Sequence, residues 1–484
     1  MHYRKCPTVR RIVALLYTLA ATYYCTCSAA PIHHESEFSQ HYLVDYKTMD
    51  LQRQPIYHRF ETIESLQSSQ HTIPSENYTK RDGIASKQTQ TIQTASFKII
   101  LDCTAPFGEP TNTTDAVGPT CRSVAMTLER AAMRLQQALF LRTPVTVNVT
   151  FKSLCIADGD TNIGKSCSLT DDTLGYAAPA AWHVFTPKAA TSYRLDYNYS
   201  YPSSLAKQYA PMDPAFAPNA IDIMVVLNSD VNWWFASDTD PLGESDSGKW
   251  GAYHTTSGGF YGSGSKSYDF EQTAVHEFCH GLGFVSSWAP WLNDTLFLPS
   301  FIESDASGNA IGVAPAFIFS RWMSDTFNSV WLRTYSDIIR QSVKDAIAQA
   351  GQEEWPTAFN NSMGGQISRA LSGPGGLFQT PGAVAAWYPD VDRTATSTNI
   401  DSSSSSSGSN IVYKYAVLYT PISYSGGSSL SHVDGTTYAG TSNLLMRPAG
   451  TPGIGLDFIL PSTSKGPIGE VTLGIFRSMG YVTI

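Results

Sequence analysis

Charged residues and long apolar runs are both scarce in this chain of 484 residues. Only 15% of the residues are charged, and acidic residues outnumber basic ones by 41 to 32, which gives a net charge of −9. Nucleic acid and anionic membrane surfaces are therefore not expected as partners. Beyond the N-terminal segment no stretch is apolar enough to cross a bilayer, and the last residues lack the hydrophobic tail of a lipid-anchor signal. We expect no membrane anchor.

Cysteine is also sparse, which argues against a disulfide-dense scaffold. Of eight cysteines, three lie before residue 28, which leaves Cys103, Cys121, Cys155, Cys167 and Cys279. In an oxidising compartment four of these five are expected to pair. Short loops favour Cys103 with Cys121 and Cys155 with Cys167, although the sequence allows other pairings. Cys279 would remain as a small buried residue and not as a metal ligand.

The N-terminus has the layout of a secretory signal peptide. Basic residues up to Arg11 precede the apolar run Ile12–Tyr24, and small residues follow at 28–30. The run is short for a membrane span, so we expect a signal peptide over 1–29 and a secreted protein. Six glycosylation acceptor sites agree with secretion: Asn77, Asn112, Asn148, Asn198, Asn293 and Asn360.

Residues 30–81 are interpreted as a propeptide that lies outside the fold. The segment is polar, has no clear periodicity and ends at Lys80-Arg81, a dibasic pair of the kind that secretory processing proteases cut. It contains no cysteine. Any inhibition of a metal site by this segment must therefore use a group other than a thiolate.

The hydrophobic pattern of residues 82–285 predicts an α+β catalytic subdomain. Strands are expected at Phe97–Leu101, Val145–Phe151, 174–177 and Ala220–Leu227, and an amphipathic helix is expected over 121–141. This order favours a twisted mixed sheet above a helix that begins near Phe270.

Two further segments complete the predicted organisation. Residues 286–415 are interpreted as a mainly helical insertion, because apolar residues from Trp322 to Val343 recur at helical spacing and Gly351 would end that helix. The serine run 402–407 predicts a loop. Residues 416–484 form a C-terminal subdomain, with a strand at Tyr413–Tyr419 and a helix within Ile468–Tyr481.

The residues with the clearest chemistry are His276, Glu277 and His280, which form His-Glu-x-x-His. On an α-helix, residues four apart lie on nearly the same face, roughly 6 Å apart along the axis, so both imidazoles can bind one metal ion. Glu277 is offset by one position and is placed to take a proton from a metal-bound water.

A catalytic zinc ion usually has three protein ligands and one open position, so a third ligand is needed. Beyond residue 81 the other histidines are His183, His254 and His432. We expect the first two to be surface or structural groups. Glu303 is an alternative ligand, because thermolysin-like enzymes place a glutamate at a comparable distance after the motif.

The residues after the motif resemble those of one zinc-protease family. Gly283 follows His280, but Ser286 stands where compact metzincins have a third histidine. The pair Ser431-His432, followed by Leu445-Met446-Arg447-Pro448, instead resembles the leishmanolysin-like metzincins, in which a long insertion separates glycine from histidine. The resemblance implies a metzincin-like catalytic domain with one zinc ion held by His276, His280 and His432.

The same resemblance implies that Glu277 is the general base and that Met446 forms an apolar floor under the metal. The chain departs from the family in its few cysteines, in its cysteine-free pro-segment and in lacking the anchor tail. Asp434 is a candidate hydrogen-bond partner for His432, since it lies two residues away.

The sequence therefore predicts a secreted zinc endopeptidase that acts on protein or peptide substrates. One alternative is a secreted glycosylated binding or adhesion protein whose metal site is structural or inactive, although the intact Glu277 argues against it. Another alternative is a thermolysin-like zinc hydrolase that uses Glu303 as the third ligand.

Overall fold

The structure is a computed structural model that describes residues 37–44, 51–54, 87–104, 119–154, 173–217, 220–231, 233–235, 267–291, 296–305, 307–390, 412–452, 455–456 and 468–484. All of them belong to one compact unit, Ser36–Ile484. The predicted Cys155 and Cys167 pair, His254, and the acceptor sites Asn77, Asn112 and Asn293 lie outside these residues.

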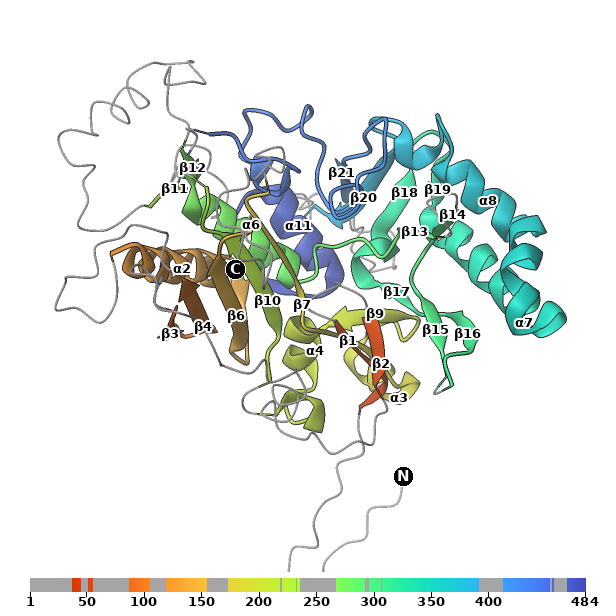
Figure 1. Ribbon diagram of the computed structural model, residues 1–484, viewed down its shortest axis with the longest axis horizontal. Coiled ribbons are helices and arrows are strands. Elements are labelled where there is room, and N and C mark those ends of the chain that lie inside the picture. Colours follow the sequence, from red (N-terminus) through yellow and green to blue (C-terminus); the bar gives the residue numbers. More distant parts are fainter. Residues whose placement is uncertain are drawn as a thin grey trace, which may run out of the picture. The chain divides into compact units, whose positions relative to one another are not determined.

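A five-stranded mixed sheet forms the first part of the fold (Figure 1). Its order is β3 (Lys87–Gln93), β4 (Phe97–Thr104), β6 (Val145–Lys152), β10 (Ile223–Asn228) and β7 (Gly175–Pro179). Strands β4, β6 and β10 are parallel, whereas β3 and β7 pair antiparallel at the two edges. The four expected strands are confirmed, with small changes at their ends.

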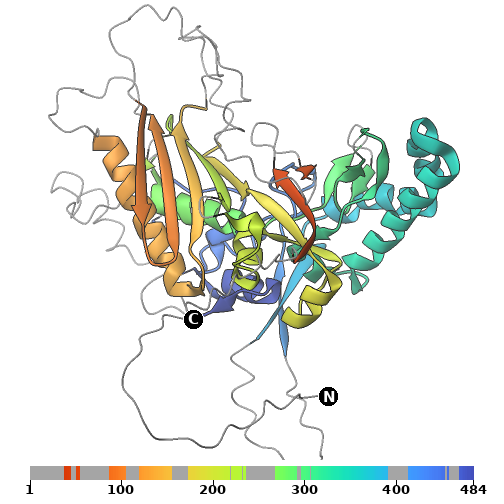
Figure 2. The same ribbon diagram turned by 90° about the horizontal axis from the view of Figure 1, so that it is seen from below.

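Two helices, α2 (Pro119–Ala138) and α6 (Phe270–Gly281), contact each other and this sheet (Figure 2). Alternate residues of β4 and β6 are buried towards them. The Phe97 ring stacks on Phe278 with centroids 6.2 Å apart, and Phe151 meets Phe270 edge-on at 5.9 Å. The strand alternation read from the sequence therefore faces the motif helix, as expected.

One predicted disulfide is confirmed. Cys103 at the end of β4 is bonded to Cys121 in the first turn of α2, with a sulfur–sulfur distance of 2.06 Å. Cys279 is free and buried in α6, also as expected.

A second sheet corrects our expectation that the predicted propeptide, residues 30–81, lies outside the fold. Its order is β17 (Ala316–Phe317), β9 (Tyr199–Pro202), β8 (Ala181–Phe185), β1 (Phe38–Val44) and β2 (Leu51–Gln54). Strand β1 pairs antiparallel with β8. Phe38 is only 3% exposed and packs against His183, Phe185 and Phe216. Strand β1 was not predicted because one buried apolar side chain in a polar segment gives no recognisable strand pattern.

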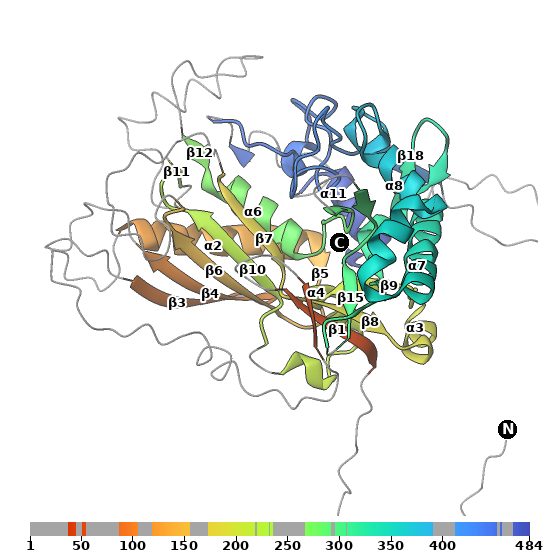
Figure 3. The same cartoon turned by 45° about the vertical axis from the view of Figure 1, so that its right-hand side comes forward.

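The described part of the interval 286–415 contains strands as well as the predicted helix. It holds α7 (Leu332–Asn361) and α8 (Met363–Ser372), which lie side by side in Figure 3. It also holds most of a four-stranded sheet of order β19 (Val330–Trp331), β18 (Met323–Asp325), β20 (Val384–Pro389) and β21 (Tyr413–Val417). The residues from Trp322 to Trp331 belong to a 3-10 turn and two short strands. Gly351, at φ 74°, interrupts α7 as expected.

The remaining elements are short, apart from the C-terminal helix α11 (Glu470–Met479), which is confirmed. Strand β22 (Val482–Thr483) pairs with β5 (Leu139–Phe140), beside the end of α2. The described helices and strands make the fold α+β, as predicted, and none of these helices has the length and apolarity to traverse a bilayer. The other elements are α3 (Pro187–Tyr193), α4 (Ser203–Tyr209), η1 (Pro214–Phe216), β11 (Trp233–Trp234), β12 (Tyr268–Asp269), β13 (Ala289–Trp291), β14 (Leu296–Leu298), β15 (Ile302–Ser304), β16 (Ala310–Val313), η2 (Ile318–Trp322), η3 (Leu377–Gln379) and η4 (Leu444–Met446).

Candidate metal centre

Helix α6 is fixed at its first turn by charged side chains. One carboxylate oxygen of Asp269 accepts from the backbone N–H of Glu271 at 2.8 Å, and the other accepts from the N–H of Leu456 at 2.6 Å. The carboxylate of Glu271 forms ion pairs with two arginines of α2, Arg130 at 3.2 Å and Arg134 at 2.8 Å. These contacts set the position of the motif histidines, one and two turns further along.

Two glycines explain how the helix ends beside its second histidine. A Cβ on Gly281 would lie 2.0 Å from Cγ2 of Ile223 in β10, so only glycine permits this close helix–sheet approach. Gly283 has φ +104°, a conformation that other residues rarely adopt. The turn at Gly283 brings the carbonyl oxygen of Phe284 to 2.8 Å from Nδ1 of His280.

His432 is held between the end of β21 and the turn that contains Met446. Leu418, directly after β21, bridges to Val433, and the carbonyl oxygen of His432 accepts from the N–H of Tyr419 at 2.8 Å. On the other side, the N–H of Val433 donates to the carbonyl oxygen of Met446, also at 2.8 Å. The two segments that carry the resemblance are thus bonded directly to each other.

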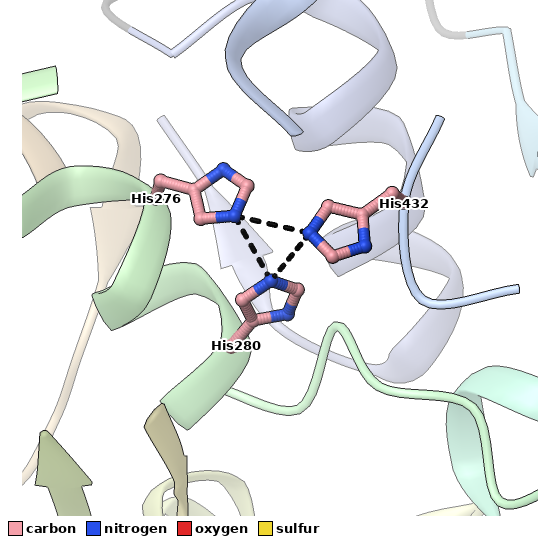
Figure 4. A group of neighbouring side chains, drawn as sticks. All are labelled: His276, His280 and His432. Carbon is pink, nitrogen blue, oxygen red and sulfur yellow. Dashed lines mark hydrogen bonds between the residues drawn. The ribbon is translucent and has the colours of Figure 1, made fainter. Parts of the chain in front are cut away.

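The three predicted ligands converge (Figure 4). The Nε2 atom of His276 lies 3.0 Å from that of His280 and 3.2 Å from that of His432, and the third separation is 3.1 Å. Two nitrogen ligands bound tetrahedrally at about 2.05 Å from zinc would be about 3.3 Å apart. The observed triangle is therefore close to the size that one ion requires.

The opposite ring nitrogens decide which atoms face the centre. Each Nδ1 lies 2.7–2.8 Å from a backbone carbonyl oxygen, that of Leu445 for His276, of Phe284 for His280, and of Ser428 for His432. A carbonyl oxygen only accepts, so Nδ1 carries the proton in each neutral ring. The three Nε2 lone pairs then point at one another without a proton between them. A cation at the centre would remove this repulsion, so the residues present fit a metal ion.

Burial keeps the three rings neutral. Burial lowers the pKa of His276 to about 4 and that of His432 to about 3, and it holds the pKa of His280 well below its usual value. Neutral imidazole is the form that binds metals, and three imidazoles suit zinc among the common transition metals. Among the described residues three potential ligands converge, the number of protein ligands that a catalytic zinc ion usually has.

Glu277 follows His276 in helix α6 and has no partner in the described structure. Its side chain is 5% exposed, and its Oε2 atom accepts no hydrogen bond from any described residue. Burial raises the pKa of this carboxyl group to about 8, whereas a nearby metal cation would favour the ionised form. Cγ of Glu277 lies 3.5 Å from where a Cβ on Gly175 would be, so the carboxylate lies beneath edge strand β7.

The rival ligand Glu303 is not part of this cluster. It lies in β15, and one of its carboxylate oxygens accepts from the side-chain amide of Gln40 in the leader at 3.3 Å. His183 is a structural group, as expected, because it is fully buried and its Nε2 lies 3.1 Å from the hydroxyl of Ser203.

The suggestion that Asp434 supports His432 is wrong. The chain turns after Val433, so that the Asp434 carboxylate accepts from the N–H of Thr437 at 2.6 Å, and Ser428 supplies the acceptor for His432 instead. None of the three carbonyl groups that orient the histidines was predicted from the sequence. Every residue has a backbone carbonyl group, so residue type does not show which carbonyl accepts a hydrogen bond. Gly283 does indicate the turn that places the carbonyl group of Phe284 beside His280.

Met446 is fully buried in η4, consistent with a position inside the fold beneath the histidine segment. Of the acceptor sites, Asn198 is exposed, whereas Asn148 and Asn360 are half-buried.

Comparison with known proteins gives one family match. A family model described as SPBPB7E8-like matches residues 57–248 and 261–483. A relative from Schizosaccharomyces pombe, "Uncharacterized protein PB7E8.01", is 23% identical over 408 residues, which cover 78% of this chain and 61% of the relative. This chain thus spans less than two thirds of the length of that relative. No solved structure matches it. Since the matched residues include both segments of the metal centre and most of the sequence, the chain belongs to the SPBPB7E8-like family.

Proposed function

We propose that this protein is a secreted zinc endopeptidase of the leishmanolysin-like metzincin type that acts on protein or peptide substrates. The observation that carries the proposal is the convergence of the Nε2 atoms of His276, His280 and His432 within 3.0–3.2 Å of one another. The buried carboxylate of Glu277, which has no partner among the described residues, supports the same conclusion, because a hydrolytic site needs a base beside its metal.

The fold around the site agrees with a metzincin-like catalytic domain. A mixed sheet packs on the motif helix, and the third histidine comes from a distant segment bonded to a methionine turn. Strand β7 has one neighbour, β10, among the described strands. Its other edge can pair with an extended peptide, which would place a peptide bond above Glu277.

The chemistry divides between the metal and this chain's own side chains. A zinc ion held by His276, His280 and His432 would supply Lewis acidity, polarising the substrate carbonyl and acidifying the attacking water. The Glu277 carboxylate accepts the proton that this water loses and then delivers it to the nitrogen of the leaving amine. The carbonyl acceptors behind each histidine ring hold the tautomer that directs Nε2 inwards.

Neither alternative gains comparable support. A thermolysin-like site would need Glu303, whose carboxylate is bonded to Gln40 away from the cluster. A structural zinc site is normally closed by four protein ligands, whereas three groups converge here among the described residues. An inactive binding or adhesion protein would have no use for a buried, unpartnered glutamate next to the ligands.

The test combines metal content with peptide cleavage on the secreted chain. Wild type should contain one zinc ion per chain and should cleave peptides until a chelator removes the metal. Glu277→Gln should keep its zinc but lose about 10²–10⁴-fold of the activity. His432→Gln should lose zinc, while the matched control Glu303→Gln should lose neither zinc nor activity. Hydrolysis that survives both Glu277→Gln and the chelator would exclude the proposed function.

A further inference from the structure

The sheet β19-β18-β20-β21 carries aromatic side chains on its outer face. In the strand register Trp331 pairs with Ser324, and Trp387 pairs with Tyr415, so these residues share one face. Tyr413 and Tyr415 are 43% and 54% exposed. The opposite face is buried, and α11 contacts β20. The outer face of such a sheet is normally polar, so core packing does not account for these rings.

The rings line a continuous groove, which we call the aromatic groove. Two adjoining hollows of about 340 Å³ and 240 Å³ share Trp331 and Trp387. The ring centroids of these two residues are 6.1 Å apart, and those of Trp387 and Tyr415 are 5.3 Å apart. The first hollow is also lined by Arg321, Trp322, Arg333 and Tyr413, and the second by Ser324, Asp325, Thr326, Ser329, Ala385 and Tyr415. Each hollow has room for about one sugar-sized ring.

The two ends of the groove differ in charge. The guanidinium groups of Arg321 and Arg333 lie over the rings of Trp322 and Trp331, at 5.2 Å and 5.4 Å. Arg321 has a carboxylate neighbour, Asp196, at 3.6 Å. Arg333 is exposed and forms no ion pair with any residue in the described part of the chain. In a protein of net charge −9, this end of the groove is positive, whereas the other end presents hydroxyl groups and Asp325.

We propose that the aromatic groove binds an acidic oligosaccharide built from carboxylated sugar rings. The C–H bonds of a sugar ring carry slight positive charge and stack on the negative faces of Trp and Tyr rings. A ring carboxylate would complete the free donor fork of Arg333. The hydroxyls of the next ring would meet the exposed Thr326 and Ser329, which lie at the polar end.

An acidic peptide is the main rival, and the construction of the groove disfavours it. Strand addition, a common way of binding an extended peptide, needs free main-chain groups at a strand edge. The floor of the aromatic groove consists instead of side-chain rings on the face of a sheet whose inner strands, β18 and β20, are paired on both sides. Nucleic acid would need positive charge along the whole groove, and only one end provides it.

The position of the groove connects it with the metal centre. Strand β21 carries Tyr413 and Tyr415, and the chain continues through Leu418 and Tyr419, which bond to the segment of His432. A glycan held in the groove would therefore keep a glycosylated protein close to the proposed catalytic site. Binding itself does not depend on hydrolysis, so it can be measured on the Glu277→Gln variant.

The experiment titrates the full-length Glu277→Gln chain with three probes and follows heat and tryptophan fluorescence. Trigalacturonic acid should bind at least about tenfold more tightly than neutral galactotriose, because the neutral sugar lacks the charge-assisted bond to Arg333. Arg333→Gln and Tyr415→Ala should each weaken binding of the acidic sugar about tenfold. The matched controls Arg142→Gln and Phe140→Ala, at exposed positions outside the groove, should leave it unchanged.

Three results would overturn the inference. Equal affinity for the acidic and neutral sugars would remove the role of the arginines. Binding of a tetraglutamate peptide in place of the sugars would assign the groove to acidic peptides. Failure of either groove variant to change binding, while zinc content and melting temperature stay at the parent values, would place the sugar elsewhere.

Discussion

Nδ1 of His276 donates to the carbonyl oxygen of Leu445 across 2.7 Å, although 169 positions separate the two residues in the chain. This bond joins the motif helix to the turn that contains Met446. The neighbouring N–H of Val433 donates to Met446 in the same turn. The two motif segments are therefore far apart in the sequence but directly bonded to each other in the structure.

Replacing Met446 with alanine should destabilise the protein and weaken metal retention. The side chain is fully buried, and truncation of a buried methionine typically lowers the free energy of unfolding by about 2–5 kcal/mol. Urea unfolding and zinc content after dialysis measure the two effects. Met363→Ala, at a position that is 68% exposed, is the control and should stay within about 0.5 kcal/mol of wild type. Similar losses in both variants would deny Met446 a special position.

Gly283→Ala should affect zinc binding more than a positive-φ glycine elsewhere. Both Gly283, at φ +104°, and Gly308, at φ +82°, would strain an alanine, each by about 1 kcal/mol or more. A Cβ at Gly283 would also lie 2.7 Å from Pro202, whereas nothing lies within 4 Å at Gly308. Relief of that clash would move Phe284 and its carbonyl oxygen away from His280.

The measurement for this pair is zinc affinity by competition with a chromogenic chelator. We expect about 10–100-fold weaker binding for Gly283→Ala and wild-type affinity for Gly308→Ala. An unchanged affinity in Gly283→Ala would mean that the Phe284 acceptor does not orient the ligand.

The three buried histidines should lower the stability of the metal-free protein in mild acid. Burial lowers the pKa of His276 to about 4 and that of His432 to about 3, whereas histidine in the unfolded chain titrates near about 6.5. Between these values the unfolded chain binds protons that the folded chain does not, so the free energy of unfolding falls as the pH drops from about 6.5 towards 4. The raised pKa values of Glu277 and Asp269 act in the opposite direction.

Comparison with a histidine variant separates the two contributions. Urea unfolding of the chelator-treated protein at about pH 7 and pH 5 should show a decrease on the order of 1–2 kcal/mol for each histidine that protonates only when unfolded. His432→Gln keeps Glu277 but has one such histidine fewer, so its decrease should be smaller. Equal decreases in both proteins would contradict the buried, neutral state of His432.

The parts of the fold and site that depend on the identity of particular side chains could be predicted from the sequence. The spacing of His-Glu-x-x-His located the helix. The resemblance of Ser431-His432 and the later methionine turn to leishmanolysin-like metzincins pointed to the distant histidine that joins the cluster. The segment from Trp322 to Trp331 was misassigned, since its aromatic residues fit helical spacing although they occupy strands and turns. Backbone acceptors and the aromatic groove arise from tertiary contacts, which no local pattern encodes.

Strand β1, which lies between β8 and β2 in its sheet, provides the last prediction. Phe38 is 3% exposed against Phe185 and His183, while the remaining bonds are mostly main-chain pairing to β8. Phe38→Ala should therefore reduce the free energy that holds β1 in place by about 3 kcal/mol. Hydrogen exchange of the β1 amides, and of those β8 amides that face β1, should then accelerate about 100-fold. The amides of β10 in the other sheet serve as the internal control and should keep their protection. Faster exchange in β10 as well would indicate global destabilisation, and unchanged exchange in β1 would mean that Phe38 does not anchor the strand.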